Sequence, residues 1–204
     1  MTEDLRQALL DLRDRDQEKR QELVERGELF EGYHPEMERV HRENAQTLEE
    51  ILDHHGWPSE DLVGPDGVEA VSLVVNHAIG LPAFQRKCLA LLSQAQDQGQ
   101  DVVLFRARLE DRIRYNERRP QVYGFLMDWD EEGQLSPWLI EHPEKVDARR
   151  AALGLGPLQE QVKVAREQAL QEKAQAPKPF AERQAEILAW AREVGWLEEP
   201  SGDP

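Results

Sequence analysis

Apolar residues recur every three to four positions along most of this chain, which is the period of an α-helix. Polar residues interrupt these apolar stripes at positions that should face a core. Six of them lie on or beside the stripes of successive predicted helices: Asp16, His41, Asn44, His77, Gln85 and Asp111. Burying a polar group is costly unless it finds a partner. The pattern therefore predicts a mainly α protein whose polar side chains gather around an interior pocket.

Proline and glycine signals set the predicted helix limits in the first half of the chain. Helices are expected over residues 3–26, 35–55, 68–79, 82–95 and 102–115. Thr2 is the expected N-cap of the first helix, and Pro35 and Pro82 suit first-turn positions. Between the second and third helices, residues 56–59 and the turn 64–67 form a corner that Trp57 should anchor. Such a corner sets the angle between neighbouring helices.

The second half of the chain begins with a change of pattern. Aromatic and β-favouring runs flank the turn residues 130–133, which predicts one β-hairpin near residues 121–140. Helical periodicity returns over 143–153 and again after Pro157, and residues 176–179 have the composition of a short linker. An amphipathic last helix then carries Trp190 and Trp196. We expect a helical, bundle-like core domain with the hairpin at 1–156 and a charged helical extension at 157–204.

Composition narrows the classes of protein to which the chain can belong. The formal net charge of −16 would repel a phosphate backbone, so nucleic-acid binding is not expected. No apolar run approaches the roughly 20 residues that a membrane-spanning helix needs, so we expect no membrane partner. The single cysteine, Cys88, lies on an apolar face and suits a buried position in a reducing compartment. These features predict an acidic cytoplasmic protein.

Two constellations of polar residues are candidates for chemistry. In the first, Asp16, His41, His77 and Asp111 are the residue types that bind divalent metals, but their spacing matches no known ligand signature. We therefore assign no metal ligands, leave the cofactor undetermined, and favour histidines that are satisfied by carboxylates and backbone groups.

The second constellation combines groups that could position a small ligand. Arg112 can form paired hydrogen bonds with a carboxylate or phosphate, whereas Gln85, Gln121 and Tyr123 can orient a planar polar group. His77 can exchange a proton near neutral pH, and we expect Asp111 to assist it. The alternative is a structural network in which the same residues satisfy one another and the backbone.

A series of short motifs resembles an uncharacterised bacterial family of mainly helical proteins, a domain of unknown function. The resemblance spans roughly residues 5–160 and departs from the family pattern at Phe125-Leu126 and in the charged tail. Its motifs, in chain order, are Gly56-Trp57-Pro58, Val63-Gly64, His77-Ala78, Phe84-Gln85, Leu109 with Asp111-Arg112, Gln121 with Tyr123-Gly124, Arg149-Arg150 and Leu153-Gly154-Leu155. The resemblance implies no reaction.

The sequence supports three hypotheses for function and does not decide whether the chain is an enzyme. The favoured one is a polar interior pocket for a small anionic or peptide-like ligand. Its catalytic residues would be His77 and Asp111, and its ligand-binding residues would be Gln85, Arg112, Gln121, Tyr123, Asn44, His41 and Asp16. The second is a non-catalytic interaction module that uses its acidic surface and C-terminal helix to bind a protein partner or a second copy. The third is a metal-dependent hydrolase.

Overall fold

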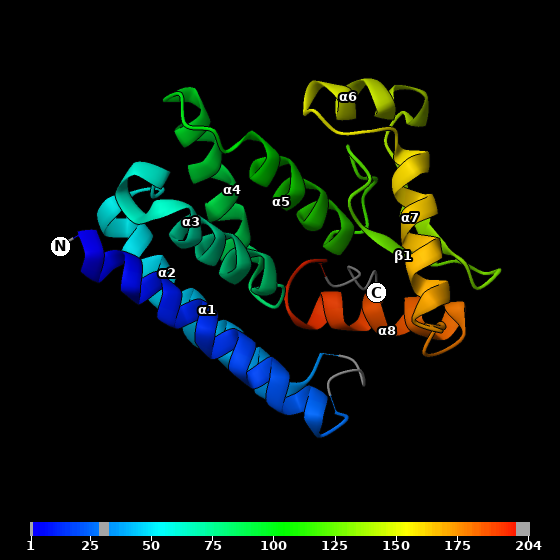
Figure 1. Cartoon of the computed structure of the whole chain (residues 1–204). Coiled ribbons are helices and arrows are strands. Elements are labelled where there is room, and N and C mark those ends of the chain that lie inside the picture. Colours follow the sequence, from blue (N-terminus) through cyan, green and yellow to red (C-terminus); the bar gives the residue numbers. More distant parts are fainter. Residues whose placement is uncertain (1, 29–32, 199–204) are drawn as a thin grey trace, which may run out of the picture. The chain divides into compact units, whose positions relative to one another are not determined.

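The computed structural model describes residues 2–28 and 33–198, and this part of the chain confirms the expected mainly α class (Figure 1). It contains eight α-helices, one 3-10 turn and one two-stranded hairpin, and 68% of the structure is helical. The chain divides into two compact units, Met1–Val102 and Val103–Pro204. This division falls after residue 102, whereas the sequence pattern predicts a domain boundary after residue 156.

The first unit is built from four helices. They are α1 (Thr2–Glu25), α2 (Pro35–His55), α3 (Glu60–His77) and α4 (Pro82–Asp97). The limits of α2 and α4 follow their signals closely, because Pro35 and Pro82 occupy the first helical position and Gly56 follows the end of α2. Helix α1 packs along both α2 and α3. The side chain of Thr2, the expected N-cap, lies outside the described residues.

Helix α3 begins earlier than the predicted 68–79 helix and contains the predicted turn as a kink. Gly64 has φ 72° and ψ 167° inside the helical segment, and Pro65 follows it. A positive φ is accessible to glycine at little cost, and proline removes one backbone donor, so the two residues bend the helix. Trp57, the expected anchor of the corner, is 6% exposed. The local turn signal was therefore correct, and helical segments lie on both sides of it.

The core of the first unit is formed by aliphatic side chains on the facing stripes of the helices. Leu9, Leu48, Val75 and Leu92 have no exposed surface. Cys88 is equally buried, and burial raises the pKa of its thiol to about 12. The expected burial of Cys88 is confirmed, and its high pKa makes it a poor nucleophile.

The second unit combines four helices with the hairpin. Its elements are α5 (Val103–Asn116), β1 (Met127–Trp129), β2 (Leu135–Pro137), the 3-10 turn Pro143–Lys145, α6 (Val146–Ala152), α7 (Leu158–Gln171) and α8 (Phe180–Glu193). The strands are antiparallel and pair Trp129 with Leu135 and Met127 with Pro137. Asp130 closes the turn, because its carboxylate accepts hydrogen bonds from the Gln134 backbone N–H at 2.8 Å and from the Ser136 hydroxyl at 2.6 Å.

A small core joins α6, α7 and the hairpin region. Val146, Leu158 and Val162 are buried together, and Met127 and Ile140 pack against them. Residues on both sides of the expected 156/157 boundary thus share one core. Because this packing includes β1 and α7, the predicted extension and the hairpin belong to the same compact unit.

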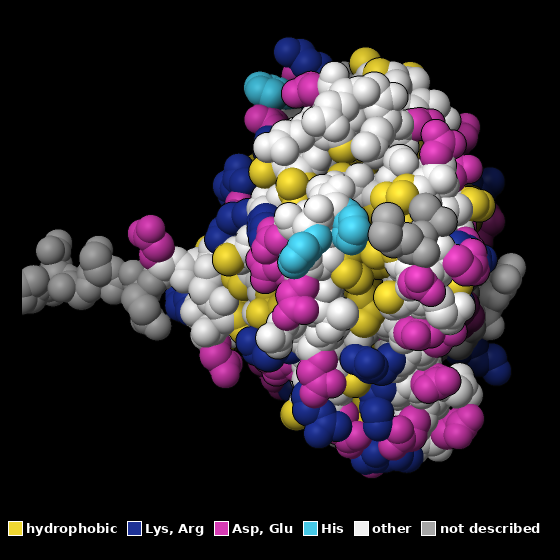
Figure 2. Space-filling model, turned by 90° about the vertical axis from the view of Figure 1, so that its left-hand side faces the viewer, with side chains coloured by type: hydrophobic (Ala, Val, Ile, Leu, Met, Phe, Trp, Pro, Cys, Tyr) yellow, Lys and Arg dark blue, Asp and Glu magenta, His cyan; other side chains and the backbone are white. Residues whose placement is uncertain are grey.

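The surface carries both signs of charge despite the acidic total. On the face drawn in Figure 2, acidic and basic side chains alternate, and histidine side chains reach the surface among them. Within the described residues, no helix is long and apolar enough to cross a bilayer.

Candidate functional site

The first unit brings together three of the predicted polar residues from three helices. Asp16 lies in the middle of α1, His41 in the first half of α2, and His77 is the last residue of α3. Asp16 occupies a position on the α1 stripe between the buried Leu12 and Leu23. Packing of α1 against α2 and α3 therefore carries its carboxylate to the two imidazoles.

The three side chains are in direct contact around the Asp16 carboxylate. His77 Nδ1 lies 3.0 Å from Asp16 Oδ1 and 2.9 Å from Oδ2, and His41 Nε2 lies 3.1 Å from Oδ2. The two imidazole rings are 5.2 Å apart between centroids. Asp16 is 1% exposed, whereas the side chain of His77 is 38% exposed. The cluster thus runs from a buried carboxylate to an imidazole at the surface.

The carboxylate of Asp16 remains ionised in this environment. Burial by itself would raise the pKa of Asp16, but the contacts with His41 and His77 outweigh burial and lower the pKa to about 2. The groups that stabilise the buried negative charge of Asp16 are therefore the imidazoles of His41 and His77.

His41 is fixed from its far side by Tyr33. The Tyr33 hydroxyl lies 2.8 Å from His41 Nδ1, and the two rings stack with centroids 5.6 Å apart. Burial raises the pKa of Tyr33, which keeps its hydroxyl protonated. His41 Nε2 lies 3.1 Å from Asp16 Oδ2 as an ion-pair contact. Among the described residues, this buried nitrogen has no hydrogen-bond partner.

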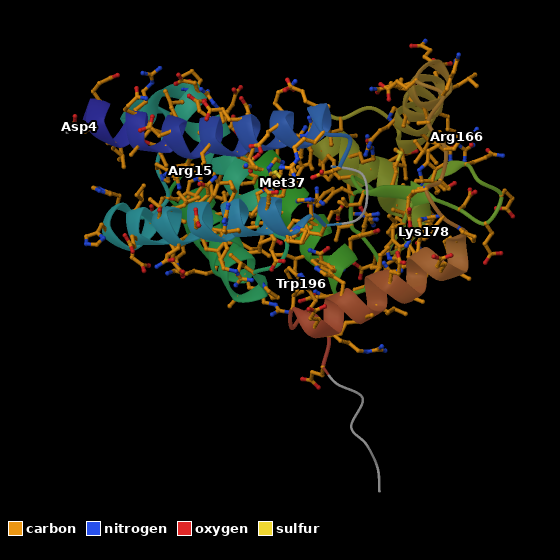
Figure 3. The ribbon with its side chains drawn as sticks, turned by 90° about the horizontal axis from the view of Figure 1, so that it is seen from below. Asp4, Arg15, Met37, Arg166, Lys178 and Trp196 are labelled. Atoms are coloured by element: carbon orange, nitrogen blue, oxygen red, sulfur yellow. The ribbon has the colours of Figure 1, made fainter. Side chains whose placement is uncertain are left out.

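Asn44, one turn beyond His41 on α2, is used to join helices. Its side-chain Nδ2 donates to the Leu12 carbonyl at 2.8 Å, and its Oδ1 accepts from Arg15 at 3.4 Å. Figure 3 labels Arg15 on α1 and Met37 on α2, and the side chains of these two helices fill the space between them. Asn44 therefore supports the cluster by holding α1 against α2.

Gln85 is fully buried in the first unit but serves a neighbouring helix. Its Nε2 donates to the Val75 carbonyl at 2.7 Å, near the C-terminal end of α3. The carbonyls in the last turn of a helix have no partner within that helix, so this bond satisfies one of them. Gln85 Oε1 has no partner among the described residues.

The other predicted residues belong to the second unit, where Asp111 organises a loop. Its carboxylate accepts backbone N–H groups from Val122 at 2.7 Å, from Tyr123 at 3.1 Å and from Phe125 at 3.1 Å. Burial raises the pKa of Asp111, and these backbone donors oppose that shift. Both oxygens are occupied by the chain itself, which favours a structural role over the expected catalytic one.

Gln121 closes the same loop by a reciprocal pair of hydrogen bonds. Its Oε1 accepts from the Leu126 N–H at 2.7 Å, and its Nε2 donates to the Leu126 carbonyl at 2.9 Å. Tyr123 contributes its backbone to Asp111, and its ring lies 6.1 Å from that of Phe125. Arg112 has a buried Nε without a hydrogen-bond partner among the described residues. Gln121 and Tyr123 thus belong to a loop network of the second unit, whereas Asp16, His41 and His77 belong to the first.

Two kinds of residue escaped prediction from the sequence pattern. Tyr33 lies in the loop before α2, where no periodicity indicates which way a side chain faces. Arg149 and Arg150 appeared only as a motif, and the structure shows what they bind. Arg149 donates to the Val122 carbonyl at 2.7 Å, and Arg150 donates to the Tyr123 carbonyl at 3.0 Å. Together with Asp111, the two arginines fix the backbone of the loop from its donor and acceptor sides.

The fold and the cluster define a mainly α protein with a buried carboxylate between two histidines. The chain belongs to a family of unknown function, DUF6624, whose sequence profile matches residues 3–174. This match extends through α7, beyond the roughly 5–160 of the resemblance based on motifs. No curated protein and no solved structure matches the chain.

Proposed function

We propose that the first unit binds a small anionic or peptide-like ligand at the Asp16, His41 and His77 cluster, with His77 as the residue that meets the ligand. One observation carries the proposal: a fully buried carboxylate faces two imidazoles from separate helices, and one imidazole reaches the surface. Binding sites for small ligands commonly contain a few convergent polar groups that fix the orientation of the ligand.

Stability alone is a weak reason for this cluster. Taking charged groups out of water is costly, and apolar side chains of similar volume often stabilise a protein equally well or better. The neighbouring stripe positions on α1, Leu9, Leu12 and Leu23, are apolar and buried. A leucine at position 16 would continue this stripe, so the aspartate and its histidines favour a functional role.

The geometry also indicates which atom of His77 is available. Its Nδ1 faces Asp16, so the remaining ring nitrogen, Nε2, is the one that can contact a ligand. A carboxylate behind one imidazole nitrogen fixes the ring orientation and tautomer, as in catalytic triads. When the imidazole is protonated, its Nε2–H can donate a hydrogen bond to the oxygen atoms of carboxylate, phosphate and amide groups, and when it is neutral Nε2 accepts a hydrogen bond.

This proposal uses a smaller set of residues than the sequence predicted. Gln85, Asp111 and Gln121 already hydrogen-bond to backbone groups in their own units. Asn44 positions α2 and so supports His41 indirectly. The predicted residues that remain available for a ligand site are Asp16, His41 and His77.

The test is ligand-dependent thermal stability of the full chain. Inorganic phosphate, citrate and glycylglycine would be titrated while Tm is measured. A ligand that binds only the native state at about 100 times its Kd stabilises it by about 2.7 kcal/mol. We expect a saturable rise in Tm for at least one probe and its loss in His77→Gln, while the exposed His142→Gln behaves as wild type. No saturable shift with any probe, or an equal shift in His77→Gln, would overturn the proposal.

A further inference from the structure

The donor atoms of the cluster have the separations expected for ligands of one metal ion. His41 Nε2 and His77 Nδ1 lie 3.1 Å and 2.9 Å from Asp16 Oδ2, and one ligand atom from each residue lies within 4.8 Å of the others. Metal bonds of about 2.0–2.2 Å to nitrogen and oxygen place neighbouring ligands roughly 3.0–3.5 Å apart. The observed spacing thus accommodates an ion after small side-chain shifts.

The orientation of His41 is a second and independent observation. Its Nε2 is buried, 3.1 Å from a carboxylate oxygen, yet it makes no hydrogen bond within the described chain. The carboxylate and this nitrogen are close enough to share one metal ion, which would satisfy both atoms. The opposite nitrogen, Nδ1, is held by the Tyr33 hydroxyl at 2.8 Å. A metal-binding histidine commonly has this arrangement, with one nitrogen on the ion and the other fixed by a hydrogen bond.

We infer that Asp16, His41 and His77 bind one divalent transition-metal ion, of which zinc and iron(II) are the chemically suited examples. Two imidazoles and one carboxylate are the donor set of catalytic zinc sites and of non-haem iron(II) sites. The inference rests on the proposed function, because it places an ion at the same cluster; with the ion on His77 Nδ1, the small ligand would be held by the ion instead of by Nε2 alone.

An ion at the cluster would keep a coordination position for that ligand. Three protein donors do not complete the coordination shell of either metal, so water or a ligand oxygen can take a further position. His77 is the exposed member, and the open side of the ion would face solvent beside it. The ion and Asp16 together would carry one net positive charge, which attracts an anionic ligand to a chain whose total charge is −16.

A second group of metal-binding residue types in the same unit supplies a control. Glu28, His34 and Glu36 are half-buried and close to one another. Their charges are already engaged, because Glu36 pairs with Lys19 at 3.2 Å and with Arg26 at 3.1 Å, and Glu28 also pairs with Arg26. His34 Nδ1 accepts the Glu36 backbone N–H at the start of α2. This group is a surface ion-pair network, and we expect no tight metal binding there.

Titration of the metal-free full chain with zinc chloride and with cobalt(II) chloride tests the inference. Calorimetry should show one tight site per chain, and cobalt(II) should develop visible absorption bands with the same stoichiometry. His41→Gln and His77→Gln should each abolish this site, whereas His34→Gln should retain it. Binding that is unchanged in His77→Gln, or no tight binding of either ion to wild type, would overturn the inference.

The role of Tyr33 adds a readout that a merely structural cluster would not give. Loss of a group that orients a metal-bound histidine typically weakens metal affinity by about 10- to 100-fold. Tyr33→Phe should show this loss in competition with a chelator and keep the stoichiometry of one. Because Asp16→Asn can disturb the packing of α1, the half-exposed His77→Gln is the deciding ligand variant, with its helical content checked by circular dichroism.

The outcomes also separate this inference from the proposed function. If phosphate, citrate or glycylglycine stabilises metal-free protein through His77, and neither ion binds, the metal inference fails and the ligand site remains. If zinc binds with the expected variant pattern but none of the three probes stabilises either the zinc-loaded or the metal-free protein, the metal site stands and the proposed ligand class is wrong.

Discussion

Two buried aspartates on helical stripes, one in each compact unit, are satisfied in different ways. Asp16 meets imidazoles from two other helices, whereas Asp111 meets backbone N–H groups of a single loop. The pKa of Asp16 is lowered to about 2, and that of Asp111 is raised. The same sequence signal therefore marks a candidate binding cluster in the first unit and a structural anchor in the second.

The largest expected effect is the loss of the anchor. Asp111→Leu would leave the N–H groups of Val122, Tyr123 and Phe125 without their acceptor, and each unsatisfied buried donor costs about 1–3 kcal/mol. We expect the free energy of unfolding to fall by about 4 kcal/mol, measured by urea denaturation. A loss below about 1 kcal/mol would show that the loop does not depend on Asp111.

Adding one methyl group at Gly124, in the loop that Asp111 holds, should also destabilise the protein. Gly124 has φ 78°, and a Cβ there would lie 2.9 Å from Leu158 Cδ1 and 3.1 Å from Ile140 Cδ1. Gly124→Ala combines a left-handed backbone with this contact, so we expect a loss of about 2 kcal/mol in the free energy of unfolding. The exposed Gly133→Ala, also at positive φ but with open space around its Cβ, is the control and should cost less.

The Asp16 cluster should tolerate apolar replacement, in contrast to Asp111. Asp16→Leu/His41→Leu removes both buried polar partners and continues the leucine stripe of α1. We expect the free energy of unfolding to change by no more than about 1 kcal/mol, since well-packed apolar groups often replace buried charged groups at little cost. Zinc binding should disappear in the same variant. A loss as large as that of Asp111→Leu would mean that the cluster is primarily structural.

The smallest effect is expected at Asp66, whose half-exposed carboxylate is a reference for the buried Asp16 and Asp111. Hydrogen bonds from Arg6, including Nε to Oδ1 at 3.0 Å, lower the pKa of Asp66. A lowered folded-state pKa contributes stability above the ordinary aspartate pKa, and this stability is lost as the pH falls through the folded value. NMR titration of the Asp66 carboxyl should show the lowered pKa. Arg6→Gln should return it to the ordinary range, and an unchanged value would contradict the assignment.

Local signals in the sequence were sufficient for much of the fold. Proline at the first helical position and glycine after the last gave the limits of α2, and the turn around Asp130 gave the hairpin. The kink at Gly64 was recognised as a turn, but the short helical segment that precedes it was not. Local signals describe the backbone preferences of a few neighbouring residues. They do not predict how Trp57 and the helices around it pack.

The site was predictable only in part, for a related reason. A polar residue on an apolar stripe indicates burial, and on that basis Asp16, His41, Asn44, Gln85 and Asp111 were all placed correctly in the interior. The stripe does not identify the partner. The same holds for the interaction hypothesis. The pattern predicted that Trp196 lies on a helix that docks, but it did not predict that Trp196 is only 4% exposed within this chain. The use of the C-terminal helix by a partner stays a prediction.

By itself, the sequence determined the helical class, most element limits and five of the polar residues that enter the interior, Asp16, His41, Asn44, Gln85 and Asp111, whereas His77 is 38% exposed. Each of these follows from periodicity and from residue preferences within a few positions along the chain. Only the tertiary structure decided that Asp16 meets His41 and His77, residues 25 and 61 positions away, while Asp111 meets its own loop. Which side chains meet depends on how α1 lies against α2 and α3, and that angle is set by the packing of many side chains together.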